Sequence, residues 1–495
     1  MNLEQYFKKF RKNTIGQDQI FPSPFGMQKM IYADWIASGR LYRPIEDKIT
    51  NEIGPFVGNT HTQASENGKL MTLVYQESHR KIKQHVNAGV NDVILTTGFG
   101  MTGAVVKFQR ILGLKSCTHF SDGTCLKDKE KPVIFITHME HHSNHTSWYE
   151  TVADVVVIKP GKDLCFNLNH LEDAIKPYKG KRRLIGSFTA CSNVTGIRTP
   201  VHEMAMLMHR YGGKVFIDYA ASAPYDDINM HPGDPLQDLD GIYFSPHKFL
   251  GGPGSSGVLI FNSELYKNPV PDQPGGGTVD WTNPWGEYKF VDDIEVREDG
   301  GTPGFLQAMR SALSIELKNQ MQVIQIHERE DHLVRLALRE LISIPGLHIL
   351  ADHLTDRLGV ISFYLDSIHY NLIVSLLSDH FGIQARGGCA CAGTYGHYLL
   401  GVSYEKSKKI TDQISIGDLS EKPGWVRLSL HPTMSDQEIV FIADAVRQIS
   451  IRHKEWSKDY TYNKHTNEFI LNINNPGRPD IDKWLTFQSD NYDNT

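Results

Sequence analysis

An aspartate and a lysine follow two apolar runs in the middle of the sequence. Residues 215–217 are apolar and end in Asp218, and residues 241–244 lead into Ser245-Pro-His-Lys248. Short apolar runs bounded by Gly and Pro are typical of buried strands, and open α/β sheets bind ligands at the carboxyl ends of their strands. A lysine can form a Schiff base with pyridoxal phosphate, and an aspartate can keep the cofactor's ring nitrogen protonated. The pair therefore predicts a pyridoxal phosphate site.

Taken alone, neither residue would carry this interpretation. An aspartate after a strand often caps a helix, and most lysines are solvated surface charges. The surrounding segments Asp218-Tyr-Ala-Ala221, Ser245-Pro-His-Lys248 and Gly251-Gly-Pro-Gly254 together resemble the class V aminotransferase family, and within it the cysteine desulfurases and selenocysteine lyases. The resemblance implies a fold type I pyridoxal phosphate enzyme that acts on an amino acid, with Lys248 and Asp218 in the two roles above.

The resemblance also implies roles for three residues in other segments. Met139-Glu-His-His-Ser-Asn144 is similar to a family segment whose first histidine stacks on the cofactor ring, here His141. Cys191-Ser-Asn-Val-Thr-Gly196 matches a turn whose asparagine, here Asn193, contacts the cofactor's phenolic oxygen and the substrate. Glu298-Asp-Gly-Gly-Thr-Pro303 matches a segment that comes from the neighbouring subunit. The match implies a homodimer in which Thr302 touches the cofactor phosphate across the interface.

A glycine-rich turn, Thr96-Thr-Gly-Phe-Gly-Met-Thr-Gly103, precedes a helical pattern. Such a turn offers free amides and the positive end of the helix dipole to an anion. The resembling family places its phosphate loop here, often with two adjacent hydroxyl residues, where this chain has Phe99 and Gly100. We therefore expect backbone amides to make the contact. The expected phosphate contacts are Gly100, Met101, Thr102, Ser245, His247 and Thr302.

Two segments near the C-terminus supply a thiol and an arginine. Ala385-Arg-Gly-Gly-Cys-Ala-Cys-Ala-Gly393 and Val426-Arg-Leu-Ser-Leu430 resemble the family's Arg-x-Gly-x-x-Cys and Arg-x-Ser motifs. The match implies that Cys391 forms the persulfide and that Arg427 binds the substrate carboxylate, for which a guanidinium is suited. The chain departs from the desulfurase pattern at Cys389, where a histidine is common, and at Ala221, where a glutamine is often found. These departures concern the choice of reaction and not the cofactor.

The resemblance favours a cysteine desulfurase or selenocysteine lyase that forms alanine, with a sulfur-acceptor protein as a possible partner. Transamination or epimerisation on the same scaffold is the alternative within the family. A binding protein that holds the cofactor without turnover is another alternative. The four histidines between His138 and His145 leave open a His/Cys metal-binding protein, although we expect no resident metal.

Composition limits the class of protein. The chain has 495 residues, of which 40% are hydrophobic and 22% charged, and its formal net charge is −6. This balance is typical of a soluble globular protein and argues against nucleic acid or an anionic membrane as a partner. The sequence has neither an apolar run of membrane-spanning length nor a secretory leader, which predicts a cytoplasmic protein. Six scattered cysteines are too few for a disulfide framework.

The order of the expected elements predicts an α/β fold. Strands alternate with helices from residue 31 to 261, which predicts a large domain with a mostly parallel seven-stranded sheet whose 257–261 strand is antiparallel. One helical pattern covers 305–344, and a smaller α+β domain follows. The expected division is an N-terminal segment 1–30, a large domain 31–303, a small domain 304–453 and a C-terminal extension 454–495. Residues 113–132, 398–424 and 454–495 receive no role from the sequence.

Overall fold

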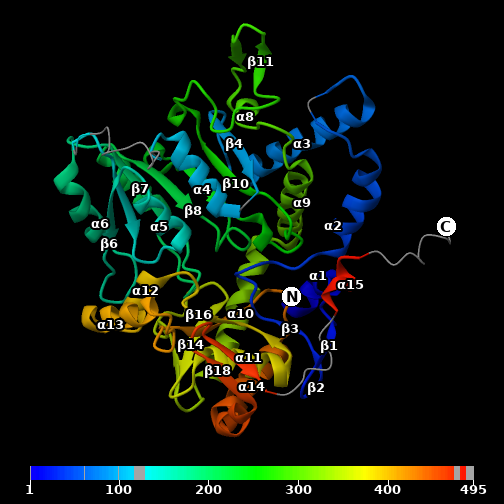
Figure 1. Cartoon of the computed structure of the whole chain (residues 1–495), viewed down its shortest axis with the longest axis vertical. Coiled ribbons are helices and arrows are strands. Elements are labelled where there is room, and N and C mark those ends of the chain that lie inside the picture. The colour runs from blue at the N-terminus through cyan, green and yellow to red at the C-terminus, as the bar shows by residue number, and fades with distance from the viewer. Residues whose placement is uncertain are drawn as a thin grey trace, which may run out of the picture.

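The larger part of the protein is built on a seven-stranded sheet. The computed structural model describes residues 2–60, 62–98, 100–115, 127, 129–472 and 480–486 (Figure 1). The order of the strands is β4-β10-β9-β8-β7-β5-β6, and β10 pairs antiparallel with both neighbours while the other pairs are parallel. The expected mostly parallel seven-stranded sheet is thus confirmed, including its antiparallel strand. The strands are β4 Asp92–Thr97, β5 Val133–Thr137, β6 Asp154–Ile158, β7 Leu184–Thr189, β8 Lys214–Asp218, β9 Gly241–Phe244 and β10 Gly257–Asn262.

Helices cover both faces of this sheet, because its central strands are apolar on both sides. Ile134 and Phe216 belong to a core that includes residues of α4, whereas Phe135 and Ile217 belong to a second core that includes residues of α3, α6 and α7. Neighbouring residues of one strand thus enter different cores, as the alternation of a strand requires. The helices are α3 Glu66–His85, α4 Gly100–Ile111, α5 His142–Tyr149, α6 Leu168–Ile175 and α7 Val201–Arg210.

The smaller part has an antiparallel four-stranded sheet in the order β13-β14-β17-β16. Its helices α10, α11 and α14 share a core with the N-terminal helix α1, in which Phe7 and Phe10 are buried. The N-terminal segment therefore packs against this part of the protein. The elements are α1 Leu3–Asn13, α10 Val323–Leu341, α11 Tyr370–Phe381, α14 Asp436–Trp456, β13 Leu347–Ile349, β14 Val360–Leu365, β16 Arg386–Gly388 and β17 Trp425–Ser429.

Two elements differ from their predicted form. The strand expected at residue 31 is β3 (Ile31–Tyr32), which pairs in parallel with β15 (Ile383–Gln384) and not with the large sheet. The helix expected over 305–344 is two helices, α9 (Phe305–Met321) and α10, because Gln322 between them has a left-handed φ of 63°. No Gly or Pro marks this break in the sequence. The expected division into 1–30, 31–303, 304–453 and 454–495 stays a prediction.

The segments without a predicted role contain regular structure. Residues 398–424 include all of helix α13, and a hairpin of β18 and β19 follows α14. Of residues 113–132, the positions 116–126 and 128 lie outside the described part of the chain. The remaining elements are α2 Arg43–Asp47, α8 Ile294–Arg297, α12 Gly393–Leu399, α13 Tyr404–Ser415, α15 Ile481–Trp484, β1 Ile20–Ser23, β2 Gly26–Lys29, β11 Val279–Thr282, β12 Tyr288–Phe290, β18 Tyr460–Asn463 and β19 Glu468–Leu471.

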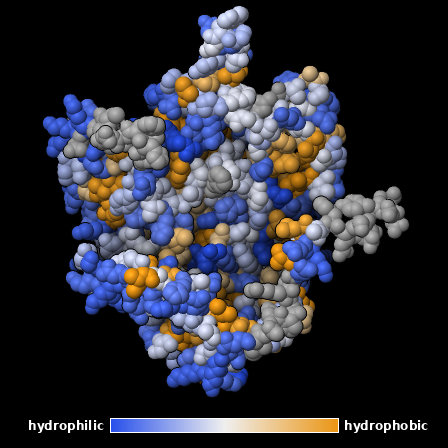
Figure 2. Space-filling view, in the orientation of Figure 1, coloured by the Kyte–Doolittle hydropathy of each residue, from blue (hydrophilic) through white to orange (hydrophobic). Residues whose placement is uncertain are grey.

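Polar residues dominate the visible surface. Figure 2 shows apolar residues as separate small patches among hydrophilic ones on this face. No helix within the described ranges combines the length and the apolar character needed to cross a membrane.

Candidate active site

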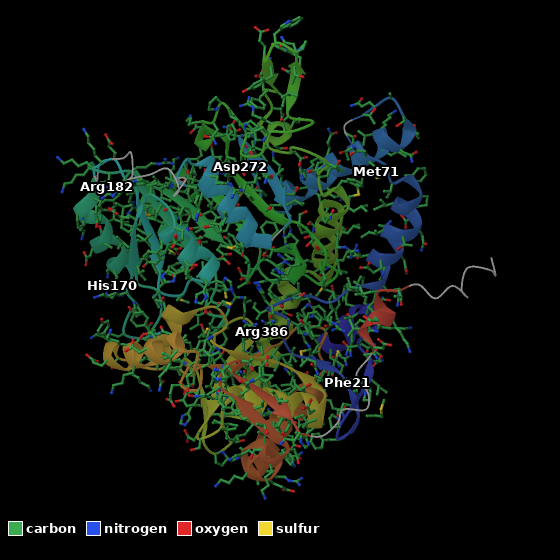
Figure 3. All side chains as sticks on the ribbon, viewed as in Figure 1. Phe21, Met71, His170, Arg182, Asp272 and Arg386 are labelled. Carbon is green, nitrogen blue, oxygen red and sulfur yellow. The ribbon has the colours of Figure 1, made fainter. Side chains whose placement is uncertain are left out.

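A cavity of about 260 Å³ lies where the carboxyl ends of β7, β8 and β9 face the small sheet. Arg386, labelled in Figure 3, lies between the two parts of the ribbon and lines this cavity from β16. Most residues expected in the site line it. These are Lys248, His141, Cys391, Asp218, Met101, Thr102, Asn193, Ser245, His247 and Arg427.

Two expected residues do not line the cavity. Gly100 is buried and only its chain neighbour Met101 lines the cavity, and Thr302 is exposed on the surface. The expectation that Thr302 acts in a neighbouring subunit concerns a second copy of the chain and stays a prediction.

Lys248 and Asp218 bring an amine and a carboxylate to the cavity. Lys248 ends a single helical turn, Pro246–Lys248, after β9, and exclusion of water around its amine lowers the pKa to about 8. Asp218 ends β8, where burial raises its pKa to about 6 although Oδ1 accepts a hydrogen bond from the Ala220 amide at 2.8 Å. A lysine with this pKa is partly neutral at physiological pH and is therefore a competent nucleophile.

His141 is a neutral imidazole on the wall of the cavity. It caps the N-terminus of α5, with Nδ1 accepting from the Ser143 amide at 3.2 Å. Burial, helped by the charge of Lys248, lowers its pKa to about 3. Since Nδ1 is an acceptor, the ring proton belongs on Nε2.

The start of α4 forms an anion cradle. The Met101 amide donates to Oγ of Ser245 at 2.8 Å. Gly100 has a φ of +59°, and a Cβ on it would lie 3.0 Å from both Ser245 Oγ and His247 Cε1. The backbone thus approaches these side chains as only glycine allows. A helix N-terminus beside a hydroxyl and an imidazole suits a phosphate group.

Two arginines share one aspartate at the small-sheet side of the cavity. Arg427, 3% exposed, donates from Nη2 to Oδ1 of Asp34 at 2.8 Å and from Nη1 to the Asn193 carbonyl at 3.2 Å. Arg386 donates from Nε to Oδ2 of Asp34 at 3.0 Å. Two guanidinium charges against one carboxylate leave a net positive charge, which can bind a substrate carboxylate.

The loop that carries Cys391 is held in an unusual backbone conformation. Ala390 and Cys391 both have left-handed φ angles, 50° and 55°. Their carbonyls accept hydrogen bonds from Asn193 Nδ2 at 2.8 Å and from the His142 amide at 2.7 Å, respectively. The Cys391 side chain is exposed, whereas Cys389 is half-buried and packs against an apolar cluster that includes Trp425. The loop therefore presents Cys391, and not Cys389, to the cavity.

The histidines between His138 and His145 are used in hydrogen bonds. His138 Nε2 lies 3.0 Å from the Leu164 carbonyl, and His142 Nε2 accepts from the Gly393 amide at 3.1 Å. Among the residues that the structure describes, no group of three or more His, Cys, Asp or Glu side chains is arranged to hold a metal ion. The geometry gives no support to the metal-binding alternative.

Sequence reasoning missed Arg386 and Asp34 as site residues. Arg386 opens the Arg-x-Gly-x-x-Cys match, and Asp34 opens the segment Asp34-Trp-Ile-Ala-Ser38 that precedes helix α2. The sequence contains both motifs, but it does not show that their residues form an ion pair, because Asp34 and Arg386 lie 352 positions apart.

The cavity fits pyridoxal phosphate. It offers an amine for the aldehyde, a carboxylate for the ring nitrogen and a cradle for the phosphate. Oδ1 of Asn193 is buried without a hydrogen-bond partner in the described part of the chain, so it can accept from a bound group. The cavity therefore has a suitable partner for the aldehyde, the ring nitrogen, the phosphate and the phenolic hydroxyl of the cofactor.

Comparison with known proteins decides the family. Residues 31–441 match the sequence profile of the family described as aminotransferase class-V. The chain belongs to this family. Members of the class V family depend on pyridoxal phosphate, which is the cofactor of this protein too.

Relatives of this class V chain include proteins named as cysteine desulfurases. A probable cysteine desulfurase of Staphylococcus epidermidis is 27% identical over 388 residues, which cover 77% of this chain and 87% of that protein. A cysteine desulfurase of Escherichia coli is 32% identical over 263 residues, covering 52% and 62% of the two chains.

Solved structures share the class V fold. A cysteine desulfurase from Thermococcus onnurineus NA1 has a TM-score of 0.72 at 21% identity, covering 90% of this chain and 98% of that chain. The cysteine desulfurase CsdA from Escherichia coli has a TM-score of 0.69 at 21% identity, covering the same shares. These likenesses confirm the fold type I architecture.

Proposed function

We propose that this protein is a cysteine desulfurase that releases alanine from cysteine and keeps the sulfur on Cys391. One observation carries the proposal: the Cys391 thiol lines the same cavity as the Lys248 amine and the Arg427 guanidinium. A transaminase or epimerase needs the amine and the arginine but has no use for a thiol there. The names of the curated relatives support the same reaction.

Each residue of the cavity has a separate role in the proposed reaction. Arg427 binds the carboxylate of the amino acid and so fixes its orientation. When bound, pyridoxal phosphate supplies an electron sink for the substrate's Cα. Lys248 holds the cofactor, and its amine, with a pKa of about 8, can take the Cα proton. With the cofactor bound, Asp218 would stabilise the protonated ring nitrogen, and His141 would lie against the ring.

The sulfur step uses the thiolate of Cys391. Its Sγ forms a bond to the substrate sulfur while the Cβ–S bond breaks. The electrons of that bond stay with carbon, which takes up a proton, so the products are alanine and a persulfide on Cys391. Selenocysteine is a second candidate substrate. When its Cβ–Se bond breaks, the electrons stay with carbon, which takes up a proton to give alanine, and the selenium leaves as elemental selenium without needing the thiol.

A matched pair of cysteine variants tests the proposal. Cys391→Ser should abolish sulfur transfer while cofactor binding stays intact, and Cys389→Ser should retain activity because that thiol packs away from the cavity. The assay measures alanine and sulfide from cysteine in the absence of any oxo acid. Wild-type alanine yield from Cys391→Ser, or turnover that requires an oxo acid, would overturn the proposal.

The proposal extends to partners and location. We infer a homodimer in which Thr302 reaches the neighbouring phosphate site, and an acceptor protein that takes sulfur from the exposed Cys391. No role for nucleic acid or a membrane is proposed. A cytoplasmic location suits the chemistry, since a reducing compartment keeps the thiol free.

A further inference from the structure

A hairpin near the C-terminus packs against the small domain. Strands β18 and β19 follow α14 and lie outside the residues matched by the class V family profile. Contacts link β19 to α11, and the Tyr460 hydroxyl of β18 donates to Oδ2 of Asp379 in α11 at 2.8 Å. The turn of the hairpin also binds the segment after α13, through the Leu419 amide and the Lys464 carbonyl at 2.9 Å.

Asn467, in the turn of the hairpin, makes the central contact. It is 8% exposed and has a left-handed φ of 59°. Its Nδ2 donates to the Tyr370 hydroxyl at 2.7 Å, and its Oδ1 accepts from the Tyr462 hydroxyl at 2.8 Å. Its carbonyl accepts from Asn371 Nδ2 at 2.5 Å. The hairpin therefore fixes the first two residues of α11.

The same two residues of α11 pack against β16. A Cβ on Gly387 would collide with Oδ1 of Asn371 and would lie 3.2 Å from Cδ2 of Tyr370. A Cβ on Gly424 would lie 2.5 Å from the Tyr370 ring. The backbone on both sides of the ring thus touches it directly, so a shift of Tyr370 displaces β16.

Strand β16 runs directly into the loop of Cys391. Successive left-handed residues such as Ala390 and Cys391 are strained and persist only where the surroundings hold them. Asn193 and His142 hold the loop from the large domain. On the other side, β16 starts the loop and rests on Tyr370. The loop therefore needs two supports, and the second depends on the hairpin.

We propose that the β18–β19 hairpin is a positioning element for the Cys391 thiol, acting through Asn467, Tyr370 and β16. The inference rests on the proposed function, because it concerns the group that accepts sulfur. It assigns a role to a part of the chain outside the family match.

The test replaces the Asn467 side chain in the full-length holoenzyme. Asn467→Gly deletes the amide but keeps the left-handed backbone without strain. We expect iodoacetamide to alkylate Cys391 about fivefold faster, the factor that corresponds to the lost buried hydrogen bond to the Tyr370 hydroxyl, which is the one that supports β16. The kcat for sulfur transfer should fall by a similar factor while KM stays nearly constant. Mass spectrometry of the Cys391 peptide measures alkylation.

Three further variants make the test specific. Asn467→Asp keeps the acceptor for the Tyr462 hydroxyl but loses the donor to the Tyr370 hydroxyl, whose own proton goes to the Lys422 carbonyl at 3.2 Å, so it should behave like Asn467→Gly. Thr461→Val removes an exposed hydrogen bond to Asn472 in the same hairpin and should change nothing. Tyr370→Phe keeps the aromatic ring but removes the hydroxyl that Asn467 binds. It is the substitute variant if Asn467→Gly fails to fold.

The outcomes separate the two proposals. Wild-type alkylation and kcat in both Asn467→Gly and Tyr370→Phe would overturn the positioning role, as would an equal effect of Thr461→Val. Alkylation of Cys391 reports the geometry of the loop even if the thiol carries no sulfur. Full activity of Cys391→Ser would therefore refute the proposed function, while the alkylation rate of Cys391 in the Asn467 and Tyr370 variants would still test the positioning role.

Discussion

The guanidinium of Arg427 donates to the carboxylate of Asp34 at 2.8 Å, and both side chains are buried. Burial lowers the pKa of Arg427, and the charge of Asp34 opposes this effect. Since Asp34 also binds Arg386, its carboxylate is the counter-ion of both arginines. Until a substrate carboxylate binds, the stability of this region depends on Asp34.

Asp34→Asn should therefore destabilise the protein. Removal of one partner of a buried ion pair leaves an uncompensated charge, which costs about 3 kcal/mol in the free energy of unfolding. Denaturant unfolding measures the loss, and an unreactive carboxylate such as propionate should reduce it by binding the arginines. Asp18→Asn, which breaks the exposed pair with Lys29, is the control and should have little effect. A loss that propionate does not reduce would contradict this account.

Gly100→Ala should weaken binding of the cofactor phosphate. The new Cβ would press on Ser245 Oγ and His247 and would strain a backbone with φ of +59°. We expect the Kd for pyridoxal phosphate to rise about tenfold, the equivalent of roughly 1.4 kcal/mol, and the Kd for phosphate-free pyridoxal to change much less. Gly113→Ala has similar backbone strain just beyond the end of α4 but meets open space. Equal effects of the two variants would mean that strain alone is responsible.

The low pKa of Lys248 predicts how cofactor attachment depends on pH. Only the neutral amine attacks the aldehyde, so attachment to the apoprotein should accelerate as pH rises and level off above about 8. Asp218 raises this pKa, so Asp218→Asn should move the midpoint to lower pH. Borohydride trapping at Lys248, followed by mass spectrometry of the peptide, measures the rate. A rate that continues to rise toward the ordinary lysine pKa of 10.5 would contradict the prediction.

Local patterns predicted the large sheet well. Strands β8 and β9 coincide with the apolar runs that end at Asp218 and Phe244, because each is a short apolar run followed by polar residues. The site residues at their ends followed from motifs beside these strands. Both predictions need information from only a few consecutive residues.

Features that depend on distant contacts were not predicted. The left-handed Gln322 separates α9 from α10 without a Gly or Pro signal. The pairing of β3 with β15 joins segments more than 350 residues apart, and Asp34 meets the arginines only through that closure. The contact of Asn467 with Tyr370 likewise joins positions 97 residues apart. Such contacts are properties of the folded chain and leave no periodic pattern in the sequence.

The proposed homodimer makes a prediction for mixed dimers of two inactive or weakened chains. Thr302 is exposed and does not line the cavity of its own chain. If it serves the neighbouring site, a dimer of Lys248→Ala and Thr302→Ala chains has one site that combines an intact Lys248 with an intact Thr302. That site should bind pyridoxal phosphate with wild-type affinity at half the wild-type stoichiometry.

Placing the two substitutions on different chains shows whether Thr302 acts in the neighbouring chain or in its own. If Thr302 acted within its own chain, the site with an intact Lys248 would lack the hydroxyl, and the mixed dimer would bind the cofactor as weakly as the Thr302→Ala homodimer. Differently tagged chains allow the mixed dimer to be purified, and absorbance titration with pyridoxal phosphate gives affinity and stoichiometry together. The Thr302→Ala homodimer supplies the weakened reference. Because one hydroxyl bond to a charged group contributes about 1.5–3 kcal/mol, the two outcomes should differ at least about tenfold in Kd.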